Sequence, residues 1–240
     1  MEDFDSLLKE FEASRPTCPI CGEPMSEASG PMTCYFCGRT EEADYVCPKG
    51  HYVCEECRLA SAEEIVLRVF RWVRERDPSL VAERIMTHPA VEIFGPAHHV
   101  IVAASLLAAS RNAGADIRES HVKRALRRLK IMPYGSCALI GACGAAVGAG
   151  TAVSLMTGAT YLSDRERSLA MEVTSRALAR IAELGGPRCC KASVYASLEA
   201  AVPLIREGLG ISLELRSLKG ACRWFDENDQ CWGSVCPYHP

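Results

Sequence analysis

Apolar residues recur at helical spacing along most of the chain. The clearest case follows Ser61. One side of this predicted helix is apolar, at Ile65, Val66, Val69, Phe70 and Val73. That spacing predicts an amphipathic helix with arginine and glutamate on its other side. Ser61 and Glu64 have the spacing of a capping box, which favours a helix start there. Asp77-Pro78 ends the helix, because proline breaks a helix interior.

The same spacing predicts helices through the rest of the chain, over residues 1–14, 78–86, 96–113, 116–132, 163–184 and 189–209. Ser163 and Glu166 repeat the capping-box spacing at one helix start, and Pro203 should bend the last helix. Residues 211–215 favour a short strand or an extended edge. No alternating series of strands appears elsewhere, so the predicted fold class is mainly α.

One uncharged stretch, residues 136–160, needs its own interpretation. It is long enough to cross a bilayer, but it is rich in Gly, Ala, Ser and Thr rather than in large apolar residues. We therefore expect a buried, closely packed helix or helix pair instead of a membrane span. Gly144 and Gly148 give it a small-residue face that another backbone can approach closely, within one chain or between the copies of a homo-oligomer.

Eight residues between positions 18 and 57 have the spacing of metal ligands. They form four pairs: Cys18 and Cys21, Cys34 and Cys37, Cys47 and His51, and Cys54 and Cys57. A two-residue gap lets a short turn present two sulfurs to one metal, and eight such ligands suit two tetrahedral zinc ions. We therefore predict a zinc-binding module of double-knuckle or ribbon-like form over residues 17–60.

Two pairings of these ligands are open. Neighbouring pairs can share an ion, or the first pair can join the third and the second pair the fourth, as in a cross-brace. The segment VCPKGHYVCEEC is similar to RING-like modules, which favours the cross-brace. The rest of the chain offers no companion for a RING-like transfer function.

Composition limits the class of protein. The 240 residues suffice for an N-terminal helix (1–16), the metal module, a helical domain (61–215) and a cysteine-rich irregular tail (216–240). A formal charge of −3 gives no general attraction to nucleic acid or to an anionic membrane. The N-terminus is acidic and amphipathic, unlike a signal peptide, so we expect a cytoplasmic protein. There, 14 cysteines indicate metals or catalysis rather than disulfides.

Seven more cysteines favour a second centre: Cys137, Cys143, Cys189, Cys190, Cys222, Cys231 and Cys236. Four of them fall at predicted helix starts or in glycine-rich turns, where backbone N–H groups stabilise thiolates. Thiolates bind soft metals or attack electrophiles. The alternatives are a metal or iron–sulfur site, a redox or sulfur-carrying pair such as Cys189 and Cys190, and purely structural cysteines. The tail cysteines either form a separate clip or fold back over this site.

His98 and His99 fall in the first turn of the helix predicted from Pro96. The positive end of the helix dipole disfavours the imidazolium form there. A neutral imidazole can ligate a metal or polarise a substrate oxygen, whereas the plainer interpretation places one ring in solvent and the other in the core. The candidate catalytic residues are therefore His98, His99 and Cys143.

Several segments together resemble the domain-of-unknown-function family 5714: CPICGEPM, VCPKGHYVCEEC, FGPAHHVIVAASLLAASRNAG, YGSCALIGACGAAVGAG, RCCKASVYASLEAAV and CWGSVCPYHP. The resemblance extends over nearly the whole chain. It implies a metal-bearing cytoplasmic protein of anaerobic prokaryotes, with a partner enzyme of the radical-SAM or methyltransferase type. The stretch GACGAAVGAG with its distant cysteines is also similar to the redox-associated C-GCAxxG-C-C family.

Two functions are compatible with these patterns. In the first, the chain is a metalloprotein with structural zinc and a second cysteine-lined metal or iron–sulfur site, acting in redox, sulfur or methyl-group chemistry of anaerobic metabolism. In the second, it is a non-catalytic zinc-containing adaptor that binds a partner enzyme or RNA. The basic strip of Arg124, Arg127 and Arg128 lacks interleaved aromatic residues, so it favours a solvated helix face over a nucleic-acid site.

Overall fold

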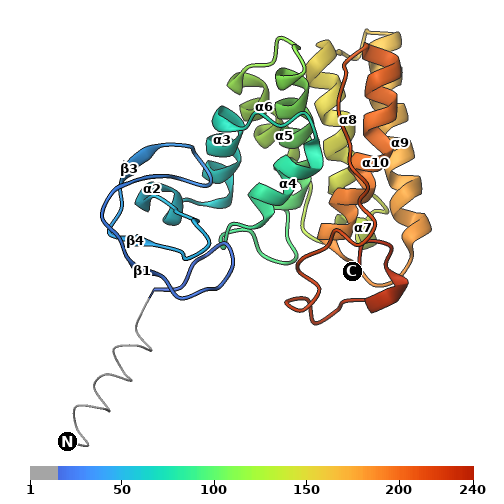
Figure 1. Ribbon diagram of the computed structural model, residues 1–240. Helices are drawn as coiled ribbons and strands as arrows, with labels where there is room; N and C mark the ends of the chain where they lie inside the picture. Colours follow the sequence, from blue (N-terminus) through green and yellow to red (C-terminus); the bar gives the residue numbers. More distant parts are fainter. Residues whose placement is uncertain (1–15) are drawn as a thin grey trace, which may run out of the picture.

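The structure is a computed structural model that describes residues 16–240 (Figure 1). The helix predicted over residues 1–16 lies outside the described residues except for its last position. In Figure 1 the chain begins in a small module at the left and continues into a larger set of helices at the right. The irregular C-terminal segment runs back along those helices and ends beneath them.

The N-terminal module contains two small antiparallel sheets. Strand β1 (Ser26–Glu27) pairs with β4 (Tyr45–Val46), and β2 (Pro31–Thr33) pairs with β3 (Thr40–Glu42). The short helix α2 (Glu55–Arg58) follows. The strands have two or three residues and expose much of their side-chain surface, so they enclose no conventional apolar core. Its buried positions are held by five cysteines and a few apolar residues outside the strands, among them Ile20 and Phe36.

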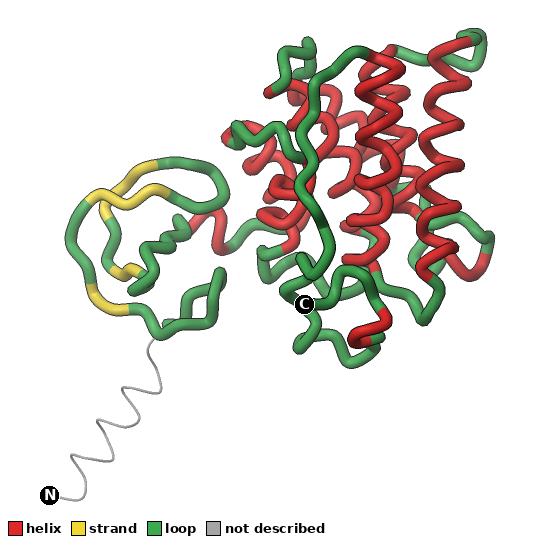
Figure 2. Tube along the Cα trace, turned by 45° about the vertical axis from the view of Figure 1, so that its right-hand side comes forward, coloured by secondary structure: helices red, strands yellow, loops and turns green. Residues whose placement is uncertain are grey.

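The larger part is all helical, as the hydrophobic spacing predicts. Its elements are α3 (Ala62–Trp72), α4 (Pro78–Met86), α5 (Ala97–Asn112), α6 (Glu119–Leu129), α7 (Ser136–Leu139), α8 (Gly144–Thr157), α9 (Arg165–Leu184), α10 (Cys190–Leu209) and the 3-10 turn η1 (Gly233–Val235). Every residue of α5 from His98 to Ser110 is buried, as expected for a helix that is surrounded on all sides. Helices α3, α4, α6, α8 and α10 all contact it, and Figure 2 shows the long helices side by side.

The uncharged stretch 136–160 folds as the pair α7 and α8, which confirms the expectation of buried, closely packed helices. The small-residue face of α8 lies against α5. A Cβ at Gly148 would stand 2.1 Å from the backbone oxygen of His99, and one at Gly144 would stand 2.3 Å from the His99 ring. Across residues 16–240, the helices lack the combination of length and apolarity that a membrane crossing requires.

Some local predictions are confirmed and others are wrong. The capping box at Ser61 and Glu64 is formed. The one predicted at Ser163 and Glu166 is not, because Ser163 Oγ instead accepts a hydrogen bond from the Thr160 N–H at 3.0 Å and closes a turn. The helix predicted over 116–132 is shorter at both ends, as α6. Residues 211–215 form no strand, since no neighbouring strand is available. The Glu214 N–H instead donates to Arg76 O at 3.0 Å, and Arg206 Nε donates to the Leu213 carbonyl at 2.7 Å.

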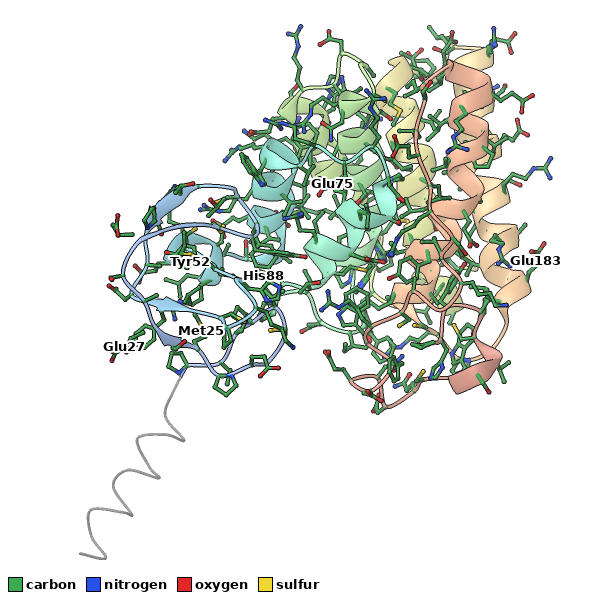
Figure 3. The ribbon with its side chains drawn as sticks, in the orientation of Figure 1. Met25, Glu27, Tyr52, Glu75, His88 and Glu183 are labelled. Atoms are coloured by element: carbon green, nitrogen blue, oxygen red, sulfur yellow. The ribbon has the colours of Figure 1, made fainter. Side chains whose placement is uncertain are left out.

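A few polar and aromatic contacts join the metal module to the helices. His88, labelled in Figure 3, lies at this junction, and its Nε2 donates to the Cys57 carbonyl at 2.7 Å. Its ring also meets Phe36 edge-on at a centroid distance of 4.9 Å. Arg84 donates to the Tyr35 carbonyl at 2.5 Å and stacks over the Tyr35 ring. The junction therefore anchors backbone groups next to the predicted metal ligands.

Candidate metal and thiol sites

The eight predicted zinc ligands converge in two groups of four. Cys18, Cys21, Cys47 and His51 form one group, and Cys34, Cys37, Cys54 and Cys57 form the other, with all ligand atoms of a group within 4.8 Å of one another. The first pair thus meets the third and the second pair meets the fourth. This grouping is the one that a cross-brace requires. Each group can hold one metal ion.

The spacing of the ligand atoms suits a tetrahedral ion. A tetrahedron with metal–sulfur bonds of about 2.3 Å has edges of about 3.8 Å. The Cys21 and Cys47 sulfurs are 3.5 Å apart, and the Cys37 and Cys54 sulfurs are 3.7 Å apart. His51 Nδ1 lies 3.7 Å from the sulfurs of both Cys18 and Cys47. The donor set of seven thiols and one imidazole is therefore arranged as two single-ion sites.

Backbone amides support the thiolate form of these ligands. The Ile20 N–H donates to Cys18 Sγ and the Lys49 N–H donates to Cys47 Sγ, each at 3.4 Å. In the second group a hydrogen bond from the Cys57 thiol lowers the pKa of Cys34 to about 4, and burial and contact with Cys34 raise the pKa of Cys57. A bound cation would favour the thiolate form at all of these sulfurs.

The helical part contains a cavity of about 350 Å³ that gathers most of the remaining candidate residues. It lies where the starts of α5, α8 and α10 meet α7 and the end of α9. Its walls include six of the residues singled out above: His98, His99, Cys137, Cys143, Cys189 and Cys190. Segments that are distant in sequence therefore contribute to one site, because five helices have a terminus at this cavity.

His98 presents an unpaired ring nitrogen to this cavity. Its Nδ1 lies 3.0 Å from the Gly95 carbonyl oxygen, which can only accept, so Nδ1 carries the proton. Nε2 then has a free lone pair, and it is buried with no hydrogen-bond partner. Burial and the nearby Lys191 cation lower the pKa of His98 to about 3. This neutral imidazole can accept a hydrogen bond or ligate a metal, and its bond to a carbonyl is typical of ligand histidines.

His99 lies beside it, against the start of α8. Its Nδ1 is also buried without a partner, and burial lowers its pKa. The ring rests on Gly144, where any larger residue would collide with it. The expectation that one of the two histidines faces solvent is wrong, because both side chains are buried.

Two thiols face the same cavity from helix starts. Cys143 is the N-cap residue of α8, and Cys190 is the first residue of α10. Burial raises the pKa of Cys190, although the Gly95 N–H donates to it. Cys137 differs from them, since it is exposed at the cavity's edge on α7. The cavity therefore holds thiols next to a neutral imidazole.

The tail cysteines lie elsewhere. Cys222, Cys231 and Cys236 line a separate, smaller pocket together with Cys189. The seven cysteines outside the module therefore divide between two neighbouring sites, and Cys189 borders both. Within residues 16–240, neither of these sites holds three or more ligand atoms as closely spaced as the two module groups.

Three further residues belong to these sites although the sequence pattern did not single them out. Lys191 is 1% exposed, Trp232 lines both pockets, and Arg188 stacks between Phe94 and Tyr134 at the cavity's edge. A signal for Lys191 was available. It lies three and seven positions before Val194 and Leu198, which places a lysine on the apolar face of α10.

Comparison with known proteins identifies the family alone. Searches of curated proteins and of solved structures found no match to this chain. One family model matches residues 66–239, which include both thiol sites of the helical part. The metal module lies before the matched region, so the resemblance of its segments to the family is not part of the match. The chain belongs to DUF5714, a family of unknown function.

Proposed function

We propose that this chain is a metalloprotein with two structural zinc ions in its N-terminal module and a reactive, thiol-lined centre in its helical part. The reactive centre would act in redox, sulfur or methyl-group chemistry. A second metal centre, of the iron–sulfur type, belongs to the same proposal. The observation that supports it most is the buried cavity in which the free Nε2 lone pair of His98 accompanies Cys143 and Cys190.

Zinc is the proposed ion in the module because of its donor set. Thiolate and imidazole ligands at tetrahedral spacing suit zinc, and a four-ligand shell without an open position is typical of structural sites. The module has little apolar core, so the two ions would hold its loops together. Aerobic or anaerobic metal analysis of the full chain should then give two zinc ions per chain for the two groups of ligands.

The cavity supports a nucleophilic role for its thiols. A thiol of Cys143 or Cys190 would lose its proton to water at the open side of the cavity and attack an electrophilic sulfur or methyl carbon. The new S–S or S–C bond would form as the donor's leaving group departs with the bonding electrons. His98 Nε2, which stays unprotonated at neutral pH, would act as a hydrogen-bond acceptor that orients the thiol or the incoming group.

The finer parts of the proposal come from the resemblance described for the sequence. They are a cytoplasmic location, anaerobic metabolism and a partner enzyme of the radical-SAM or methyltransferase type. Chemistry that carries sulfur or methyl groups agrees with such a partner, because both classes of enzyme handle these groups. The family match over residues 66–239 covers the cavity that would perform it.

The test is a map of cysteine modification. The full-length protein, purified anaerobically, is incubated with a polysulfide or with a methyl sulfonium donor, and each cysteine is then examined by peptide mass spectrometry. We expect a persulfide or methyl group on Cys143 or Cys190 before the exposed Cys137. His98→Gln should slow this modification, because it removes the acceptor that orients the reacting groups, whereas His121→Gln, a change on the surface of α6, should not. Modification that follows exposure alone, with Cys137 first, would contradict the reactive centre.

An adaptor function is the second candidate, and one feature favours it. Apolar residues beside the cavity face solvent: Leu139 is 76% exposed and Ile140 is 63% exposed. Such residues are suited to a protein partner. If the adaptor function is correct, Leu139→Ser with Ile140→Ser should abolish binding to a partner enzyme, while cysteine modification stays unselective.

A further inference from the structure

The C-terminal tail brings three cysteines to the start of α10. After α10 the chain returns along the helices, and its last residues fold beneath them (Figures 1 and 2). Cys222, Cys231 and Cys236 there line one pocket with Cys189, the N-cap residue of α10. Apart from the short turn η1 the tail has no regular secondary structure, so local backbone hydrogen bonding alone does not explain its fixed path.

The backbone around these sulfurs repeats that of the metal module. In the module, the amide two residues after Cys18 or Cys47 donates to the cysteine sulfur at 3.4 Å. In the tail, the Gly233 N–H donates to Cys231 Sγ at 3.4 Å, again two residues on. The Trp224 N–H donates to Cys222 in the same way. This turn presents a sulfur as a thiolate ligand.

The fourth cysteine, Cys189, also accepts hydrogen bonds. The Ala192 N–H lies 3.4 Å from Cys189 Sγ, and Asn228 Nδ2 donates to it at 3.8 Å. Asn228 itself is buried within the tail. Donors from α10 and from the tail therefore converge on one sulfur, and they favour its thiolate form against the burial that raises the pKa of Cys189.

A buried cation lies beside these thiols. Lys191 Nζ has one hydrogen-bond acceptor, the Met86 carbonyl at 3.4 Å, and lies 4.8 Å from the centre of the Trp224 ring. No carboxylate of residues 16–240 forms an ion pair with it. A buried ammonium needs a compensating anion. The nearby groups that can carry negative charge are Cys190, Cys189, Glu227 and Cys222, and two of these four, Cys189 and Cys222, line the pocket of the tail cysteines.

The arrangement of the four sulfurs differs from that of the single-ion sites. The module groups place every ligand atom within 4.8 Å of the others, whereas these four cysteines do not form such a group. A multinuclear cluster separates its terminal thiolates more widely than one ion does. Trp224 and Tyr238, both buried, provide the apolar shell that limits access of water to such a cluster.

We propose that Cys189, Cys222, Cys231 and Cys236 bind an iron–sulfur cluster, with Lys191 as its neighbouring counter-charge. Four cysteine thiolates are the ligand set of such clusters. This deepens the proposed function, on which it rests for the identity of the second metal centre. It also places the cluster next to the reactive cavity, since Cys189 and Trp232 line both.

The first experiment uses the full chain purified anaerobically. We expect bound iron and acid-labile sulfide, together with absorbance near 400 nm that dithionite bleaches. Iron should be absent from protein in which any one of the four cysteines is changed to serine. Cys137→Ser is the matched control and should keep its iron. All five variants should retain the zinc of the module, which shows that they fold. A colourless wild type, or zinc in place of iron at this site, would overturn the proposal.

A second measurement avoids any variant that fails to fold. The wild type is treated with iodoacetamide before and after the cluster is destroyed by ferricyanide and EDTA, and the labelled cysteines are mapped. The four proposed ligands should be labelled only after destruction, and Cys137 in both samples. Protection of Cys143 and Cys190 in place of the tail cysteines would refute this ligand set. Reactive cavity thiols in a protein without iron would refute the cluster and leave the thiol-lined reactive centre of the proposed function standing.

Discussion

At the scale of single residues, His98 shows how burial determines chemistry. The sequence places it at a helix start, where a neutral ring is favoured. In the folded chain, burial and the nearby Lys191 cation lower the pKa of His98 to about 3, a larger effect than that of the helix start. The Gly95 carbonyl fixes the proton on Nδ1, so Nε2 is a base or a ligand and not a proton donor at neutral pH.

This pKa has a consequence for stability. The unfolded state binds a proton at His98 below about pH 6.5, whereas the native state stays neutral until about pH 3, so stability falls as the pH decreases between these values. The slope is about 1.4 kcal/mol per pH unit for this one group. We expect urea denaturation at pH 7, 6 and 5 to show that the stability of the wild type relative to His98→Gln falls as the pH decreases, by about half this amount from pH 7 to 6 and by nearly all of it from pH 6 to 5. Parallel pH profiles for the two proteins would contradict the assignment.

Among the helices, α8 carries glycines that let its backbone pack closely against α5 and α9. Gly148 lets its backbone lie against the first turn of α5, and Gly150 does the same toward Ala170 and Thr174 of α9. Because Gly144 lies under the His99 ring, the same packing positions the histidines of the cavity. The stability of the bundle and the geometry of the site therefore depend on the same helix face.

Gly148→Ala tests this packing. The added Cβ would lie 2.1 Å from a backbone oxygen that cannot move alone, so we expect a loss of about 1–3 kcal/mol in the free energy of unfolding. This loss should appear although alanine has the higher helix propensity. Gly208→Ala is the matched control. Its Cβ would meet the flexible end of Leu169 at 2.9 Å, and it should stay within about 1 kcal/mol of the wild type. Equal effects of the two changes in urea denaturation would rule out the packing argument.

The whole molecule has two parts, the N-terminal metal module and the region that the family model matches. The match begins at residue 66, after the last module ligand, Cys57. The module contacts the helices through groups such as His88 and Arg84, but it adds no residue to the cavity walls. We therefore propose a structural role for the module and locate the proposed chemistry in the matched region.

Metal removal tests that division. A zinc chelator should unfold residues 17–60, because their buried positions are mainly cysteines, while α5, α8 and α10 keep their own apolar core. Hydrogen exchange followed by mass spectrometry should show fast exchange in the module and continued protection of α5. Cys34→Ser should reproduce the effect without chelator. Loss of protection throughout the helices would show instead that the two parts fold as one unit.

Much of the fold could be predicted from the sequence, because the signals were local. The helical spacing around Ile65 and Val69, the capping box at Ser61 and the proline at position 78 each act within a few residues. The predictions of a strand at 211–215 and of a helix cap at Ser163 were wrong because they also relied on local signals. A strand needs a partner from elsewhere in the chain, and a serine can satisfy an adjacent turn instead of a helix.

The sequence by itself determined which side chains can act as ligands: four pairs in the module, and seven further cysteines with two adjacent histidines. Spacing within a pair is short enough for the local backbone to set it. Only the tertiary structure decided how these groups combine, because their partners lie tens of residues away. It joined the first pair to the third, separated the tail cysteines from Cys143 and Cys190, and buried Lys191 beside the tail cysteines. Helix packing brings these distant segments together, and no local sequence pattern encodes these tertiary contacts.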